Sequence, residues 1–363
     1  MNRHGLLRPR DFKSLVSTNS TISATQSILM IFEKKFKMSR FAGLTLRAVL
    51  VLFKAPRFDR MPDMYSDTHF HFKSLREDEE WTRQGVLRAM ARTGFKFALD
   101  IGTDCDDLLS RQELFENTFA LMAGEEGGMS DVAACKNFLY FSAGIWPDPE
   151  SIKNRAACVE TLKKNILAAK ASSDPFRKKI CALGECGLDH HWNPSGVDKR
   201  SQGDFDAAMV EAERELFMAQ LQLAKELGLP VIVHSRDAAV ETLECVKESG
   251  YGGRCVIHCY SYGVDEARKF LDLGCVISFS GSVTYAKKSK MEETRALAAY
   301  IPQERIFLET DAPYLAPVPM RGKPNNPNYI QLTYDFVAQA MGVSARRLCE
   351  IVEENAKNFF DMA

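Results

Sequence analysis

Several patterns that would place this 363-residue chain in a familiar class are missing from its sequence. It contains ten cysteines but no C-x-x-C pair, so neither a zinc ribbon nor a dithiol redox motif is indicated. The cysteines are scattered through apolar runs, and we expect them to be small buried side chains in a reducing compartment. The apolar stretch Phe41–Phe53 is interrupted by Arg47 and is shorter than the roughly 18 residues that span a bilayer.

The signatures of several enzyme classes are absent as well. The sequence has no H-E-x-x-H zinc motif, no Walker phosphate loop and no G-x-S-x-G nucleophile elbow. The glycine-rich turn of dinucleotide-binding sheets does not follow the first predicted strand. Any catalytic chemistry must therefore come from another arrangement of residues.

Charge is present in balanced amounts but is unevenly distributed. The 47 basic and 48 acidic residues give a net charge of −1, and a composition of 45% hydrophobic and 26% charged residues is typical of soluble globular proteins. Residues 1–64 hold 12 basic and 4 acidic residues, so this segment carries +8 and residues 65–363 carry −9. The asymmetry predicts a basic N-terminal extension, residues 1–64, and an acidic body, residues 65–363, that forms one domain.

The N-terminal extension has no fold pattern of its own, and two interpretations of it remain open. Residues 1–30 are rich in Arg, Ser and Thr and contain a single acidic residue, as in mitochondrial transit peptides. The alternative is a misassigned start codon, because Met61 and Met64 stand just before the first strong strand signal. We expect a cytoplasmic protein that does not associate with membranes, with a mitochondrial location as the alternative if the extension is a genuine transit segment.

The body alternates short apolar strands with helical stretches. The sequence predicts eight strands: Tyr65–His71, Phe95–Gly102, Phe138–Trp146, Ile180–Glu185, Pro230–His234, Cys255–His258, Cys275–Ser280 and Ile306–Asp311. Helical spacing of apolar residues lies between them, for example in Glu211–Gly228, where Gly228 is expected to end the helix, and in Val264–Gly274. A last helix is predicted over residues 344–360 with Ser344 as its N-cap. Eight strands that alternate with helices predict an α/β fold, a (β/α)₈ TIM barrel in a single domain. The alternative is a doubly wound sheet.

Polar residues follow the apolar part of several predicted strands, where a buried strand should not carry them. They are His69, His71, Glu185, His234, His258 and Asp311. In (β/α)₈ barrels the C-terminal strand ends form the active-site face, and strand alternation places His69 and His71 on the same side. Each residue alone could be an ordinary core or surface residue, and Glu185 could simply pair with Arg236. Together, four imidazoles and two carboxylates exceed the needs of one tetrahedral ion, so we expect two metal ions that share a carboxylate.

These motifs resemble those of the TatD-type metal-dependent deoxyribonucleases, a branch of the amidohydrolase-like barrels. The matching segments, in the family's order, are Asp67–His71, Gly184–Asp189, His234–Ala238, His258–Ser261, Ser278–Gly281, Glu309–Pro317 and Arg321–Lys323. The resemblance covers about residues 65–360, and the N-terminal extension has no counterpart in it.

The resemblance implies two ligand sets that share Glu185. The first is His69, His71, Glu185 and Asp311, and the second is Glu185, His234 and His258. The expected cofactors are two divalent ions, Mg²⁺, Mn²⁺ or Zn²⁺, because the ligands alone do not select one metal.

Two positions depart from the family pattern without affecting the predicted metal ligands. Trp146 stands where the family usually has a histidine near the substrate, and Asn326 stands where an acidic residue is common. His190 and His191 replace a frequent aromatic residue and could either touch the substrate or only shape their loop. We therefore expect the departures to affect substrate preference.

The hypothesis for the reaction is attack of water, its pKa lowered by the ions, on a phosphodiester phosphorus. Asp311 would accept the proton of that water and Glu185 would bridge the ions. Arg236, Arg321 and Lys323 would neutralise charge on the phosphate oxygens, unless they are solvated surface charges. The run Lys287–Lys290 could follow a nucleic-acid backbone or could be a solvated helix start.

Three function classes are compatible with these residues. We favour a deoxyribonuclease, an exonuclease or an endonuclease, with DNA or alternatively RNA as substrate and no obligate protein partner. Another metal-dependent hydrolase of the same barrel class, acting on a small amide, ester or lactone, is the alternative. A metal-binding scaffold without activity is the third, and it is disfavoured because all six ligand positions are intact.

Overall fold

The computed structural model describes residues 65–77, 81–191 and 202–362, so the expectations for residues 1–64 lie outside the described residues. Eight strands form one parallel sheet in chain order. They are β1 (Ser66–Phe70), β2 (Phe97–Asp100), β3 (Leu139–Ala143), β4 (Ile180–Asp189), β5 (Val231–Arg236), β6 (Cys255–Ile257), β7 (Val276–Phe279) and β8 (Ile306–Leu308). The ring is closed between its ends, where the His71 N–H donates to the Ala312 carbonyl at 2.8 Å. The predicted TIM barrel is confirmed, and the doubly wound sheet is excluded.

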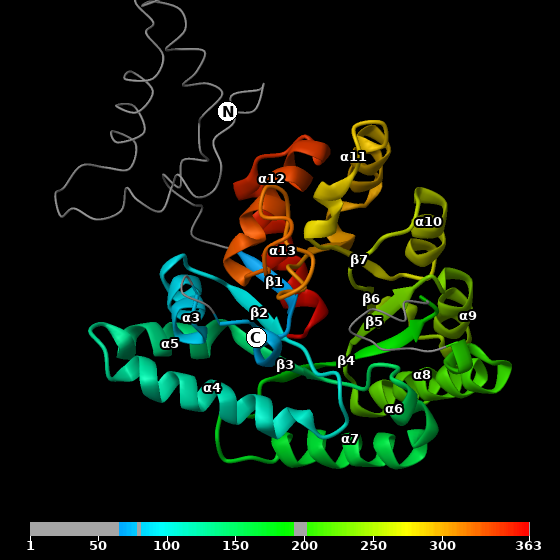
Figure 1. Cartoon of the computed structure of the whole chain (residues 1–363), viewed down its shortest axis with the longest axis horizontal. Helices are drawn as coiled ribbons and strands as arrows, with labels where there is room; N and C mark the ends of the chain where they lie inside the picture. The colour runs from blue at the N-terminus through cyan, green and yellow to red at the C-terminus, as the bar shows by residue number, and fades with distance from the viewer. Residues whose placement is uncertain (1–64, 78–80, 192–201, 363) are drawn as a thin grey trace, which may run out of the picture. The chain divides into compact units, whose positions relative to one another are not determined.

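Helices surround the strands, with α4 and α7 on one side, α8 to α10 on the next and α11 to α13 near β1 and β7 (Figure 1). Their bounds are α3 (Arg83–Arg92), α4 (Asp107–Ala123), α5 (Gly128–Phe138), α6 (Pro149–Lys153), α7 (Arg155–Lys170), α8 (Ala207–Leu227), α9 (Ala239–Ser249), α10 (Val264–Asp272), α11 (Met291–Tyr300), α12 (Ile330–Met341) and α13 (Ala345–Phe359). The helix ends predicted at Gly228 and Ser344 are confirmed, whereas α8 begins at Ala207, before the predicted Glu211, and α10 ends at Asp272, before Gly274. Gly228 ends α8 in the left-handed conformation at φ 66°, and the Ser344 hydroxyl caps α13 by accepting from the Arg347 N–H at 3.1 Å.

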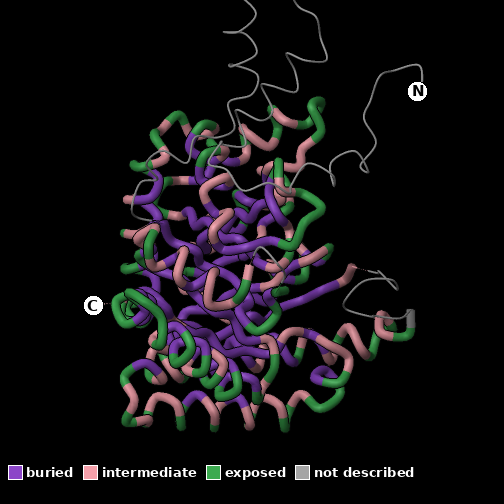
Figure 2. Tube along the Cα trace, turned by 60° about the vertical axis from the view of Figure 1, so that its left-hand side comes forward, coloured by how far each residue is buried: buried purple, intermediate pink, exposed green. Residues whose placement is uncertain are grey.

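The core lies in and around the strands, while exposed residues gather on the outer helices (Figure 2). In β5, the consecutive residues Val231, Ile232 and Val233 are all buried, as expected for a parallel strand that is covered on both faces. All ten cysteines lie in the described part of the chain and are free thiols, and seven of them are buried. None of the described helices combines the length and the apolar character needed to cross a membrane.

The strand β4 is longer than predicted. It was expected to end at Glu185, but it pairs with β5 as far as Asp189, which lies opposite Arg236. The extension carries β4 beyond the metal-ligand candidate Glu185 and adds Asp189 to the same end of the barrel. Conversely, β6 and β8 end at Ile257 and Leu308, so His258 and Asp311 occupy the loops just after these strands.

Candidate metal centre

The carboxylate of Glu185 lies at the centre of four imidazole rings. Its Oε1 atom is 2.8 Å from His234 Nδ1 and 3.3 Å from His258 Nε2. Its Oε2 atom is 3.3 Å from His69 Nε2 and 3.6 Å from His71 Nε2. Each carboxylate oxygen thus faces two rings, which is the arrangement expected of a carboxylate shared between two cations.

Asp311 completes the cluster on the side of β1. Its Oδ1 atom lies 3.4 Å from His71 Nε2 and 3.6 Å from His69 Nε2. The residue adopts a left-handed backbone conformation, φ 55°, which aspartate tolerates better than most residues, and its N–H donates to the His69 carbonyl at 2.8 Å. The backbone that closes the barrel therefore also sets the position of this carboxylate.

Two groups of donor atoms have a spacing that a metal ion could bridge. One consists of His69, His71 and Asp311, and the other of His69, Glu185 and His258, with all donor atoms of a group within 4.8 Å of one another. His234 adjoins the second group, since its Nδ1 atom is 3.2 Å from His258 Nε2. The structure thus brings all six predicted ligands together, and His69 belongs to both groups.

Two glycines of β4 allow this strand to approach β5 closely. Gly184 has φ 133°, and a Cβ atom there would come within 2.6 Å of the Ile232 carbonyl oxygen. Gly187 has φ 154°, and its Cβ would lie 1.9 Å from the His234 carbonyl oxygen. Side chains at either position would separate the strands, so the glycines are what place Glu185 next to His234.

Burial and neighbouring charges shift the pKa values of the predicted metal ligands. Burial, reinforced by His258, lowers the pKa of His69 to about 4, so this ring is neutral at physiological pH. Burial opposes ionisation of Glu185, but the surrounding histidines, His258 foremost, outweigh burial and hold its pKa well below the usual range. For His258, Glu185 and Glu309 overcome burial and raise the pKa well above its usual value.

The residues fit a divalent cation. The Nε2 atoms of His69 and His71 face each other at 3.2 Å, both directed at the carboxylate oxygens, and Nδ1 of His69 is buried without a hydrogen-bond partner among the described residues. Neutral imidazoles and ionised carboxylates are donors for zinc and manganese, and carboxylates also suit magnesium.

A carboxylate lies behind each of two ligand imidazoles, and the sequence prediction did not include either one. Asp189 Oδ2 is 3.0 Å from His234 Nε2, the ring nitrogen that does not face Glu185. Glu309 Oε1 is 3.4 Å from His258 Nδ1, and Glu309 also accepts hydrogen bonds from the Cys259 N–H at 2.6 Å and from the Ser278 hydroxyl at 2.6 Å. The sequence did contain a signal for both carboxylates, because Asp189 lies in the same motif as Glu185 and Glu309 in the same motif as Asp311.

Asp67 is a third buried carboxylate at this face. It accepts hydrogen bonds from the Thr310 N–H at 2.9 Å and from the Thr310 hydroxyl at 2.6 Å. Burial raises the pKa of Asp67 to about 8, although these hydrogen bonds oppose the rise. Asp67 thereby links β1, which carries His69, to the segment that carries Asp311.

The predicted substrate-binding cations occupy different surroundings. Arg236 Nη1 lies 3.8 Å from Asp189 Oδ2, the same oxygen that contacts His234. Arg236 therefore pairs with Asp189 and not with Glu185. The guanidinium carbon of Arg321 lies 4.4 Å from the Tyr285 ring centroid, and Lys323 is exposed on the same loop. Contact with a substrate remains a prediction for all three.

The other singled-out residues lie in or beside loops, and whether they touch a substrate remains open. His190 Nε2 is 3.4 Å from Glu213 and His191 Nδ1 is 2.6 Å from Asp237. Asn326 is buried and its side chain accepts from the Asn328 N–H at 2.9 Å. The run 287–290 is exposed and immediately precedes α11.

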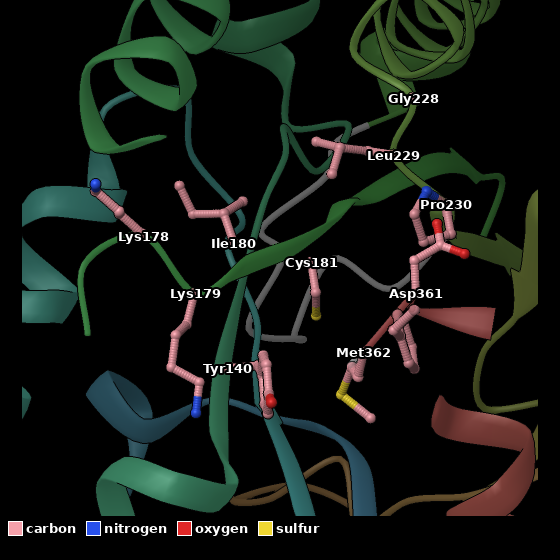
Figure 3. Close-up of a pocket in the computed structure, with 11 residues that line it drawn as sticks. Tyr140, Lys178, Lys179, Ile180, Cys181, Gly228, Leu229, Pro230, Asp361 and Met362 are labelled. Carbon is pink, nitrogen blue, oxygen red and sulfur yellow. The ribbon is translucent and has the colours of Figure 1, made fainter. Parts of the chain in front are cut away.

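Two cavities lie at opposite ends of the barrel. One, of about 430 Å³, adjoins the cluster and is lined by His71, Lys73, Thr103 and Asp106, among others. The other, of about 460 Å³, is at the start of β4 and β5 (Figure 3).

Two charged groups of the cavity at the start of β4 and β5, Lys179 and Asp361, have structural partners. The Lys179 amine donates to the carbonyls of Lys136 and Asn137 at the end of α5 and lies 3.8 Å from the Tyr140 ring centroid. Asp361 is 2.6 Å from Arg254. Of these two cavities, the one beside His71 is the one with a predicted metal ligand in its wall.

Comparison with known proteins agrees with this geometry. A sequence model of the family described as "TatD related DNase" matches residues 66–361. The chain belongs to this family. It is therefore an enzyme, a metal-dependent hydrolase of the class that acts on ester bonds.

Individual TatD-family relatives are similar over most of the barrel. The chain is 34% identical over 302 residues to the "Uncharacterized metal-dependent hydrolase YcfH" of Escherichia coli K12, covering 81% of this chain and 94% of the relative. It is 34% identical over 189 residues to the "3'-5' ssDNA/RNA exonuclease TatD" of Pectobacterium parmentieri, covering 51% of this chain and 67% of the relative. The crystal structure of YJJV, a TatD homologue of Escherichia coli K12, has a TM-score of 0.62 at 25% identity and covers 84% of this chain and all of that one.

Proposed function

We propose that this TatD-family hydrolase is a deoxyribonuclease that cleaves phosphodiester bonds of DNA with two divalent ions. The observation that carries the proposal is the position of Glu185, which has two imidazole nitrogens facing each of its oxygens. The family's description and the exonuclease name of the Pectobacterium relative support nucleic acid as substrate. We infer that Glu185 bridges the two ligand sets and that DNA is degraded from an end.

When bound, the two ions would lower the pKa of water and offset the charge of a phosphate group. Four histidines, Glu185 and Asp311 would hold them. Asp311 keeps 12% of its side chain exposed, so it could accept the proton of an attacking water. Arg236, which lies beside Asp189, would orient phosphate oxygens.

The test uses the purified chain with end-labelled single-stranded DNA, duplex DNA and RNA, together with a panel of small amides, esters and lactones. Cleavage of DNA that is abolished by a chelator and restored by Mg²⁺, Mn²⁺ or Zn²⁺ is the expected result. The distribution of product lengths separates stepwise release from an end from internal cleavage. Turnover of a small neutral substrate without cleavage of DNA would overturn the proposal in favour of the other hydrolase class.

A further inference from the structure

Trp146 follows β3 at the active-site end of the barrel on a firmly held backbone. The preceding residue, Ile145, donates its N–H to Gln220 at 2.8 Å and accepts from the Gln220 amide at 3.0 Å. The Trp146 N–H donates to the Thr103 carbonyl at 3.0 Å. Gln220 is fully buried on α8, so these bonds fix the segment from two sides.

The indole ring of Trp146 contacts His234 of the predicted ligand cluster, and Trp146 remains partly exposed. Its centroid is 5.9 Å from that of His234, with the two planes at 74°. On the opposite flank, the ring of Tyr314 is 5.9 Å from His71 at 73°, and Tyr314 is 41% exposed. Among the described residues, these are the two rings other than imidazoles that contact the six ligands, and they border the cluster on two sides.

This arrangement matches the chemistry of a phosphodiester, which joins two nucleosides. A phosphate held at the cluster carries one nucleoside toward each flank. Flat aromatic rings bind nucleobases by stacking, which is tolerant of sequence because every base has a π-face. Inside a duplex both faces of a base are covered by its stacked neighbours, whereas an unpaired base at a single-stranded end can turn a face to Trp146.

We propose that Trp146 determines substrate specificity by stacking on the unpaired base at one side of the scissile phosphate, with Tyr314 as the opposing wall. The inference rests on the proposed function and deepens it, because it names the residue of this chain that would select substrates with an unpaired base beside the scissile phosphate. The backbone of Trp146 is fixed and its ring contacts His234, so less freedom is lost when a base stacks on it, which lowers the entropic cost of stacking.

The competing explanation is that Trp146 only shields His234 from water. The two roles differ in what a truncated side chain should change. A shield acts on metal binding and on every substrate equally, whereas a stacking ring acts only on substrates that contain a base at that position. An oligonucleotide with an abasic site beside the scissile phosphate separates them.

The experiment measures kcat and KM of wild type, Trp146→Ala, Trp146→Phe and Tyr314→Ala on a single-stranded oligonucleotide and on its abasic counterpart. Trp81→Ala is the control, because Trp81 packs on Tyr329 and does not contact the ligands. We expect Trp146→Ala to raise KM by about tenfold on the normal oligonucleotide, with bound metal unchanged. On the abasic substrate its KM should equal that of wild type, and Trp146→Phe should recover most of the loss.

An equal loss on both substrates, or a loss of bound metal, would overturn the proposal. Binding of a dye-labelled oligonucleotide to Asp311→Asn, with and without Trp146→Ala, tests stacking independently of hydrolysis. Tight binding that weakens about tenfold with Trp146→Ala supports the inference even if wild type fails to cleave DNA, in which case the proposed function alone fails. Affinity that does not depend on Trp146 overturns the inference whether or not DNA is cleaved.

Discussion

Asp189 holds the far nitrogen of His234: its Oδ2 atom lies 3.0 Å from Nε2, while Nδ1 of the same ring faces Glu185. This contact fixes the ring orientation, and the negative charge makes the imidazole a stronger ligand. The neighbouring residues depress the pKa of Asp189 against the effect of burial, chiefly through the hydrogen bond to His234, so it is ionised in the folded protein.

Replacing Asp189 by Asn should therefore weaken metal binding by about 10- to 100-fold while the barrel stays folded. Metal affinity can be measured by competition with a chelator of known strength. Asp237→Asn is a matched control, because Asp237 also pairs with a histidine, His191, but lies outside the cluster. Equal affinities of the two variants would contradict the role assigned to Asp189.

Asp311→Asn should retain much of the bound metal but lose about 10²- to 10⁴-fold in turnover, because the amide cannot accept a proton from water. Initial rates on single-stranded DNA at saturating metal give the comparison. A wild-type rate in this variant would remove Asp311 from the proposed mechanism.

Glu185→Ala should reduce the number of bound ions below two per chain, because it removes the carboxylate that faces both ligand sets. Glu185→Gln preserves the shape of the side chain and tests whether the negative charge is needed. Elemental analysis after gel filtration gives the stoichiometry. Glu150→Ala is a surface control with 78% of its side chain exposed, and it should bind as many ions as wild type.

The pH dependence of metal binding follows from His234. Burial alone would lower its pKa, but the hydrogen bonds with Asp189 and Glu185 outweigh burial and raise the pKa to about 8 in the metal-free protein. A folded pKa above the ordinary 6.5 stabilises the metal-free protein below about pH 6.5, and this contribution disappears as the pH rises through about 8. Ligand protons also compete with metal, so the stabilisation by added metal should grow over the same interval.

Thermal unfolding between pH 6 and 9, with chelator and with metal, checks this prediction. The two melting curves should diverge as the pH rises, and His234→Gln should reduce the divergence. Curves that stay parallel across this range would show that His234 does not couple protons to metal binding.

The sequence was sufficient to predict the barrel and the cluster because both follow from local rules. Eight apolar strands separated by helices define the barrel, and polar residues at its strand ends, such as His234 and His258, converge by topology alone. Glu309 and Asp189 escaped prediction because they act on ligands of other strands, and strand register is not visible in a single sequence. The contact of Arg321 with Tyr285 depends on the packing of two loops, and no local pattern specifies it.

The hydrogen bonds between Asp67 and Thr310 join residues that are 243 positions apart. The first and last strands of the barrel meet there, and so do His69 and Asp311. An incomplete chain emerging from the ribosome thus cannot assemble this ligand set until nearly all of the barrel has been synthesised. Metal binding at the His69–Asp311 side would therefore require a nearly complete barrel, so a nascent or truncated chain would lack any hydrolysis that depends on that metal.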